Sequence, residues 1–273
     1  MYISKFRFLV WGAMIFCFSL VIIFSSVLAE NKKDKNLSVS EARERLSNMG
    51  WSYANEKKFK QAYFKQIKKG DWETVQLFIM SGMTPDTRNR FKETATMVAA
   101  GSGQLEILVQ FIDISDLTAR DRMGWTVSLN AAKGGTSKMI EILNKKKVDF
   151  KVKSTNNLDH LMAAAFGGNV STFQALFKLG LVYDLNAQDN NGKSWLIHAV
   201  SNYRKEILKE FAKDKYNNYL LHVNFELTDS RGNTARALAK NLNQPLLVTI
   251  IDTLIAKQKE LRQAQKNAVV SVN

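Results

Sequence analysis

Three histidines and one cysteine are the side chains best suited to metal binding or nucleophilic chemistry in this 273-residue chain. His160, His198 and His222 lie far apart, so a shared metal site would require three separate segments to converge. Cys17 lies in an apolar stretch and has no second cysteine with which to form a disulfide. No Gly-x-Ser-x-Gly elbow, phosphate-binding loop or His-Glu-x-x-His motif occurs. We therefore expect no enzymatic activity, no metal and no cofactor.

The chain is basic, with 39 Lys and Arg against 25 Asp and Glu, a formal net charge of +14. Such a charge favours anionic partners, which include acidic proteins, phosphate-bearing lipids and nucleic acid. Lysine runs occur at residues 57–60, 65–69 and 145–153. We expect these runs to be solvated and to lie on the flanks of the molecule, apart from a binding face. A hydrophobic content of 45% is sufficient for a packed core.

The N-terminal residues have the composition of an export signal. Lys5 and Arg7 precede an uncharged stretch at residues 8–29, and the residues that follow are polar. This pattern predicts a signal peptide over residues 1–29, cleaved near Ala29. The alternative is an uncleaved anchor, because 22 apolar residues are long enough to cross a bilayer. Either reading predicts that residues 30–273 are exported, as a periplasmic or secreted protein or as one anchored by residues 8–29.

The rest of the chain repeats with a period of about 33 residues. Related stretches with a small-residue pair and a following glycine begin at Thr94, Thr126 and Asp159, and a fourth, less regular copy begins at Ser194. Each is followed by a second stretch with apolar residues three and four apart, the spacing of a helix face. An Asp-x-x-Gly turn precedes the copies at Thr126 and Ser194, at 121–124 and 189–192, and recurs at 229–232 before a last, degenerate copy. The repeating unit is therefore a turn followed by two short helices.

This unit resembles the ankyrin repeat, and the leader resembles that of exported bacterial ankyrin-repeat proteins. The resemblance implies an all-α ankyrin-repeat solenoid of stacked helix-turn-helix units with short turn or hairpin loops. We expect a linker and N-terminal capping helix at 30–54, about six degenerate repeats at 55–258, and a basic C-terminal tail at 259–273. One continuous core should run through the stack. The alanine pairs should lie where inner helices press together, and four glycines should end these helices in the left-handed conformation: Gly70, Gly103, Gly135 and Gly168.

The chain also departs from the family pattern. The usual Pro-Leu-His is replaced, so the histidine hydrogen bonds between loop and helix are absent. We expect the apolar residues at the histidine position to replace them by packing and the loops to be looser; these residues are Met97, Leu129, Met162 and Ile197. The 40-residue interval between Asp189 and Asp229 predicts an insertion at about 213–225.

The resemblance further implies that a concave face, made of turn tips and the exposed edges of inner helices, holds a protein partner. Phe91, Met123 and Trp125 beside Arg90 and Arg122 are of the types enriched at interface cores and hot spots. Phe91 and Trp125 could instead fold over the turns to cover the stack. The complete predicted site comprises Arg90, Phe91, Arg122, Met123, Trp125, Lys133, Asn156, Phe166, Asn190, Asn191 and Lys193.

These observations predict an exported, non-enzymatic scaffold for protein–protein interaction. Its partner is a protein, and the net charge favours an acidic one. We expect a monomer with no small-molecule substrate, no nucleic-acid partner and no membrane contact except through an uncleaved N-terminal segment. The alternatives are a basic binder of anionic polymers or membrane surfaces, and an enzyme.

Overall fold

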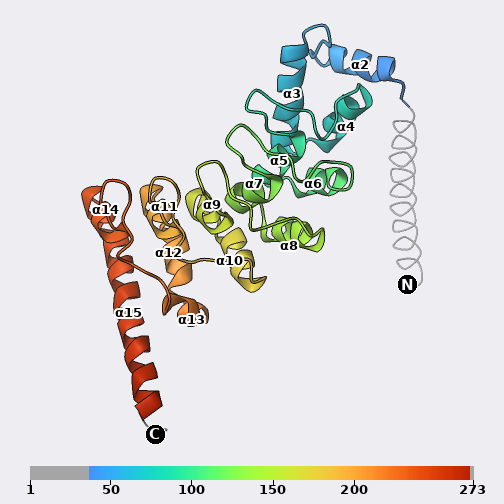
Figure 1. Cartoon of the computed structure of the whole chain (residues 1–273). Coiled ribbons are helices and arrows are strands. Elements are labelled where there is room, and N and C mark those ends of the chain that lie inside the picture. The colour runs from blue at the N-terminus through green and yellow to red at the C-terminus, as the bar shows by residue number, and fades with distance from the viewer. Residues whose placement is uncertain (1–36, 271–273) are drawn as a thin grey trace, which may run out of the picture.

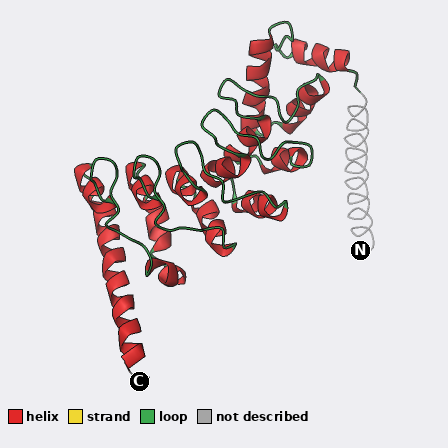
Figure 2. Cartoon of the chain, in the orientation of Figure 1, coloured by secondary structure: helices red, strands yellow, loops and turns green. Residues whose placement is uncertain are grey.

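A computed structural model describes residues 37–270, so the predicted signal peptide lies outside the described residues. Pairs of helices stack side by side in a curved row, joined by loops (Figures 1 and 2). This arrangement confirms the predicted all-α repeat solenoid. The inner helices are α3 (Glu56–Lys69), α5 (Ala95–Gly101), α7 (Val127–Gly134), α9 (His160–Gly167), α11 (Trp195–Ser201) and α14 (Ala235–Asn241). Their outer partners are α4 (Trp72–Met80), α6 (Leu105–Phe111), α8 (Ser137–Lys145), α10 (Val170–Lys178), α12 (Lys205–Phe211) and α15 (Pro245–Val270).

All six inner helices begin at a side chain that caps the first turn. Each cap residue accepts a hydrogen bond from the backbone amide three residues later, which satisfies one of the amides that a helix start leaves free. The cap residues are Asn55, Thr94, Thr126, Asp159, Ser194 and Thr234. No helix among residues 37–270 is both long and apolar enough to cross a membrane.

Small residues let the inner helices approach one another closely. Both alanines of the pairs in α5, α7 and α9 have 0% of their surface exposed. The apolar residues at the histidine position are also buried, which confirms that packing replaces the missing hydrogen bonds: Met97, Leu129, Met162 and Ile197.

Three of the four glycines predicted to end inner helices are left-handed, with φ of 76°, 74° and 76° at Gly70, Gly103 and Gly168. The prediction is wrong for Gly135, which has an extended backbone with φ −81° and ψ −154°. A Cβ at Gly135 would clash with the carbonyl oxygen of Ala131, so the site requires glycine for space. The left-handed conformation is kept without glycine at Tyr203, with φ of 58°.

The buried residues of the described part of the chain form two clusters, where the sequence predicted one continuous core. The first joins α2 (Val39–Asn48), α3 and α4 to one side of α5 and α6. The second begins with Met97 and Leu108, on the other side of α5 and α6, and continues to Leu254 in α15. The clusters therefore meet at one helix pair, which contributes to both.

Both ends of the stack are closed by helices. At the N-terminal end, the predicted capping helix is α2, where Ser38 and Glu41 form a capping box and Leu46 is fully buried. At the C-terminal end, the predicted insertion forms a short 3-10 helix η1 (Asp214–Tyr216) and helix α13 (Asn217–Leu220). Helix α13 packs against the long helix α15, and Asp214 of η1 forms an ion pair with Lys257 of α15 at 2.7 Å.

Helix α15 runs without a break across residue 259, at which the predicted basic C-terminal tail begins. The amide of Gln258, which is 5% exposed, donates to the carbonyls of Leu220 and Val223 at 2.6 and 2.8 Å. Lys257 reaches the carbonyl of Ala212 at 2.7 Å. The start of the basic half of α15 is thus anchored to the insertion, and most residues from 259 to 270 are exposed.

Candidate functional site

The loops that precede the inner helices are each organised by one polar side chain. In the third unit, Oδ1 of Asp121 accepts the backbone amides of Met123 and Trp125, both at 2.8 Å. The glycine three residues after this aspartate, Gly124, has φ of 72°, as the Asp-x-x-Gly pattern predicts. Asn89 takes the place of the aspartate in the second unit, where its Oδ1 accepts the amides of residues 91 and 93 at 2.8 and 3.1 Å.

Backbone hydrogen bonds connect the tips of successive loops. The amide of Arg122 donates to the carbonyl of Phe91 at 3.0 Å, and the amide of Thr155 donates to that of Met123 at 2.9 Å. The series continues through the last two units, with the amides of Asn190 and Ser230 donating to the carbonyls of Asn156 and Asn191 at 3.0 and 2.8 Å. Main-chain hydrogen bonds between units therefore hold the loop tips in place, which argues against the expectation of looser loops.

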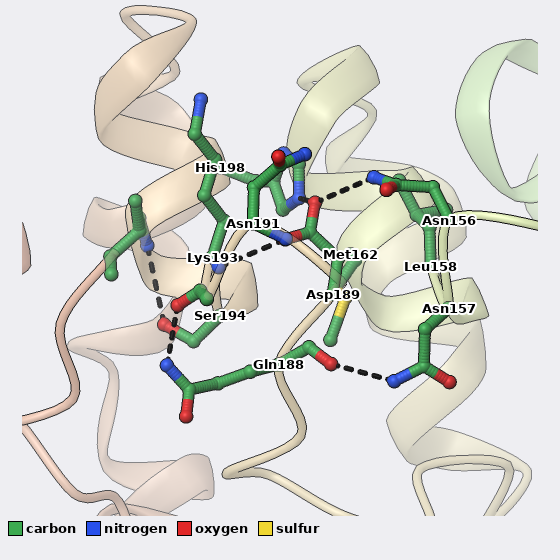
Figure 3. Close-up of polar contacts among 12 residues, drawn as sticks. Asn156, Asn157, Leu158, Met162, Gln188, Asp189, Asn191, Lys193, Ser194 and His198 are labelled. Atoms are coloured by element: carbon green, nitrogen blue, oxygen red, sulfur yellow. Dashed lines mark hydrogen bonds and ion pairs between the residues drawn. The ribbon is translucent and has the colours of Figure 1, made fainter. Parts of the chain in front are cut away.

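Asp189 is the most connected of these loop carboxylates, and its side chain is 1% exposed (Figure 3). Its Oδ1 accepts the amides of Asn191 and Lys193 at 2.8 and 2.9 Å. Its Oδ2 accepts Nδ2 of Asn156, in the preceding unit, and pairs with Nε2 of His198, both at 3.1 Å. Asp189 therefore fixes its own loop, the loop before it and the following inner helix.

Four predicted site residues surround this carboxylate. Asn156 is half-buried and points its amide at Asp189. Asn190 is exposed, and its side-chain amide donates to the carbonyl of Thr155 at 3.2 Å. Asn191 is exposed and Lys193 half-buried, and their backbone amides complete the turn. The structure thus gives Asn156 and Asn190 a role in holding the loops together, in addition to the predicted role in binding.

The second and third loops place basic and apolar side chains at the surface. Phe91 is 48% exposed and Met123 is 61% exposed. The Cζ atom of Arg90 lies 4.5 Å from the centre of the Phe91 ring, and Nη2 of Arg122 donates to the carbonyl of Arg90 at 3.0 Å. The structure therefore brings these four predicted residues into one surface patch.

Lys133 extends this surface from the third unit to the fourth. Its Nζ lies 5.4 Å from the ring centre of Trp125 and 5.2 Å from that of Phe166. Trp125 is half-buried and packs against the core, so it covers the stack in part, as the alternative reading proposed. Phe91 does not belong to either core cluster.

Comparison with known families agrees with the helix-loop-helix geometry. A family model described as ankyrin repeats, three copies long, matches residues 64–154 and 128–221. Together these ranges cover more than half of the chain. The chain belongs to the ankyrin-repeat family. Ankyrin repeats are generally scaffolds for protein–protein interaction and are typically not enzymes. A comparison with curated proteins finds no match.

The three histidines of this ankyrin-repeat chain occupy separate environments. His160 is 2% exposed and its Nε2 lies 2.9 Å from Oγ of Ser128, which is itself 0% exposed. His198 pairs with Asp189, and His222 is exposed in the insertion. Among residues 37–270, no group of three His, Cys, Asp or Glu side chains could hold a metal ion.

Burial of His160 predicts a pH-dependent stability. Burial lowers the pKa of His160 from 6.5 to about 3, so the folded protein keeps the ring neutral. Below pH 6.5 the unfolded chain binds a proton that the folded chain does not, so the free energy of unfolding falls as the pH falls. His160 alone should lower the free energy of unfolding by roughly 1.5 kcal/mol between pH 6.5 and pH 5.

Urea unfolding of the full chain at the two pH values measures this loss. On acidification, the free energy of unfolding of His160→Gln should fall less than that of the wild type, and the difference should equal this amount. His222→Gln, at an exposed side chain, is the matched control and should retain the full pH dependence. Equal pH dependence in wild type and His160→Gln would contradict the assignment.

One part of the surface was not predicted from the sequence. A groove of about 1090 Å³ lies between α3 and the loop of the second unit. We call it the basic groove; it is lined by Glu56, Lys57, Lys60, Gln61, Phe64, Lys65, Lys68, Lys69, Arg88, Asn89, Arg90 and Phe91. Two lysine runs that we expected apart from the binding face therefore share one groove with the predicted site residues Arg90 and Phe91. The available signal was a four-residue spacing of polar positions along 56–69, which puts them on one helix face.

Proposed function

We propose that this ankyrin-repeat protein is an exported scaffold, without catalytic activity, that binds a protein partner along its loop tips and the exposed edges of its inner helices. The observation that supports this most directly is the patch formed by Arg90, Phe91, Arg122 and Met123. It combines exposed apolar side chains with arginines, the combination enriched where protein interfaces are tightest. Lys133, between Trp125 and Phe166, continues this patch to the next unit.

The loop tips are held in fixed positions, which also supports a binding role. Each tip is held by its own polar side chain and by a backbone bond to its neighbour, so the patch has a defined shape before a partner arrives. A preformed surface needs less ordering on binding. The residues around Asp189 complete this surface in the fourth and fifth units.

A second function, binding of anionic polymers or membrane surfaces, is favoured by the cations of the basic groove. Salt dependence distinguishes the two. Binding to a polymer through phosphate contacts weakens steeply as salt rises, whereas a partner held by buried apolar side chains is retained at about 0.2 M salt.

The test combines crosslinking and affinity capture of a partner from the exported compartment with a matched pair of variants. Arg122→Ala with Trp125→Ala should weaken binding of the captured protein at least tenfold, because both side chains lie in the proposed interface. Lys178→Ala with Tyr183→Ala removes an exposed cation and an exposed aromatic outside the site, and should change the affinity less than twofold.

Unchanged affinity in the folded Arg122 and Trp125 variant would overturn the placement of the site. The N-terminus of the recovered chain tests export in the same experiment. A chain that begins at Glu30 supports export with cleavage, and recovery only from the cytoplasm contradicts it.

A further inference from the structure

The basic groove has a composition that selects a particular kind of ligand. We propose that it binds an acidic peptide segment of the partner protein, with carboxylates along the lysines of α3 and one apolar side chain against Phe91. This inference rests on the proposed function, since it assigns a chemistry to one part of the same binding surface.

The charge of the basic groove favours an anionic ligand. Within residues 37–270, seven Lys and Arg residues line the groove and Glu56 is its only acidic residue. Among the described residues, Lys60 alone of the five groove lysines forms an ion pair, with Glu56 at 2.6 Å. Lys57, Lys65, Lys68 and Lys69 are exposed. A row of like charges on one helix repels itself, and an anionic ligand relieves that repulsion.

The length and spacing of the row suit a short peptide. The lining positions recur on successive turns of α3 from residue 56 to residue 69. At 1.5 Å per residue this face is roughly 20 Å long, the span of about six residues of extended chain. Alternate residues of an extended chain are roughly 7 Å apart, close to the helical pitch, so alternating carboxylates can meet successive lysines.

Aromatic side chains give the groove an apolar part that a simple polyanion would not use. Phe64 is 6% exposed and belongs to the N-terminal core cluster, so it forms a fixed wall. Phe91 is 48% exposed on the opposite loop. An acidic peptide with one Leu or Phe can cover the Phe91 ring, whereas a phosphate chain leaves it in water.

The arginines are less suited to phosphate than their number suggests. Nη1 of Arg88 already donates to the carbonyls of Lys92 and Arg120 at 2.7 and 2.8 Å. The guanidinium of Arg90 lies over one face of the Phe91 ring, so it is already engaged in a cation–π contact. Most of the unengaged positive charge is on lysine, a point charge that serves a carboxylate without the paired geometry of an arginine fork.

The experiment measures binding of two fluorescein-labelled decapeptides to the purified full chain by anisotropy. Both alternate Glu with neutral residues; one carries a central Leu and the other has Gly at that position. The groove variant is Lys65→Glu with Lys69→Glu. The control, Lys145→Glu with Lys259→Glu, makes the same change in net charge at exposed lysines outside the groove.

We expect the Leu peptide to bind at least tenfold more weakly to the groove variant and less than twofold more weakly to the control. Phe91→Ala should weaken the Leu peptide about fivefold and leave the Gly peptide unchanged. Circular dichroism and thermal unfolding verify that each variant is folded. An equal loss in the groove variant and the control would overturn the proposal, as would no measurable peptide binding to the wild type.

Inorganic polyphosphate and a single-stranded DNA oligonucleotide serve as competitors. Tighter binding of either than of the Leu peptide, lost in the groove variant, would assign the groove to anionic polymers and overturn the peptide proposal. If the groove variant still holds the captured partner while the Arg122 and Trp125 variant does not, the groove proposal fails and the proposed function stands.

Discussion

Replacing Gly167 by alanine is expected to lower the free energy of unfolding by about 2–3 kcal/mol, although the same change usually stabilises a helix by about 1 kcal/mol. Gly167 is the last residue of α9, and a Cβ there would overlap the carbonyl oxygen of Lys133 in α7. The obstacle is backbone, so it cannot rotate away as a side chain can. The two inner helices would have to move apart along their whole contact.

Gly101→Ala is the matched control for this effect. Gly101 also ends an inner helix, α5, but its Cβ would meet only the side chain of Asn130, 3.2 Å away at Oδ1. Its free energy of unfolding should change by less than about 1 kcal/mol. Gly134→Ala should resemble Gly167→Ala, because its Cβ would overlap the carbonyl oxygen of Gly101. Urea unfolding measures all three, and similar values for Gly167→Ala and Gly101→Ala would contradict the explanation.

The variant Asp189→Ala is expected to have a free energy of unfolding about 3 kcal/mol or more below that of the wild type. The substitution removes a buried carboxylate that accepts hydrogen bonds from four donors. Two backbone amides, Asn156 and His198 would then lack a partner. The loss of stability should affect mainly the last units, because the stability of a stacked array is approximately a sum of unit and interface terms.

Hydrogen exchange locates this loss. Amides of α11 and α14 should exchange faster in Asp189→Ala, while those of α3 and α5 should be unchanged. Asp121→Ala removes the equivalent loop carboxylate, which accepts two backbone amides and has no histidine partner. The free energy of unfolding of Asp121→Ala should be about 1–2 kcal/mol below that of the wild type. A loss from Asp121→Ala as large as that from Asp189→Ala would show that the contacts of Asp189 to neighbouring elements contribute nothing.

The repeat could be predicted because the residues within each unit determine where its helices begin and where they pack. Thr94, Thr126 and Asp159 mark helix starts, and the alanine pairs mark the closest packing. The requirement for glycine at position 167 could not be predicted in this way, because it depends on a carbonyl group one unit away. The rule for helix ends explains Gly168 and wrongly covers Gly135, whose extended backbone is set by Ala131 and the start of α8.

The candidate site was predicted in part for a similar reason. Arg90, Phe91, Arg122 and Met123 were found from their places in the repeat, and the structure brings them together. The lysines of α3 were missed because the first unit lacks the turn motif, so nothing in its sequence indicates which loop its helix faces. Their charge was visible, but their neighbours Arg88 and Phe91 belong to the next unit.

The backbone bonds between loop tips bear on how the protein would hold a partner over time. Each tip takes its position from the tip beside it, from the second unit to the sixth. A partner that moves one tip must therefore strain the neighbouring ones, so induced changes of shape are resisted along the row. Affinity differences between partners should then appear mainly as differences in dissociation rate, with association rates nearly constant apart from the effect of charge.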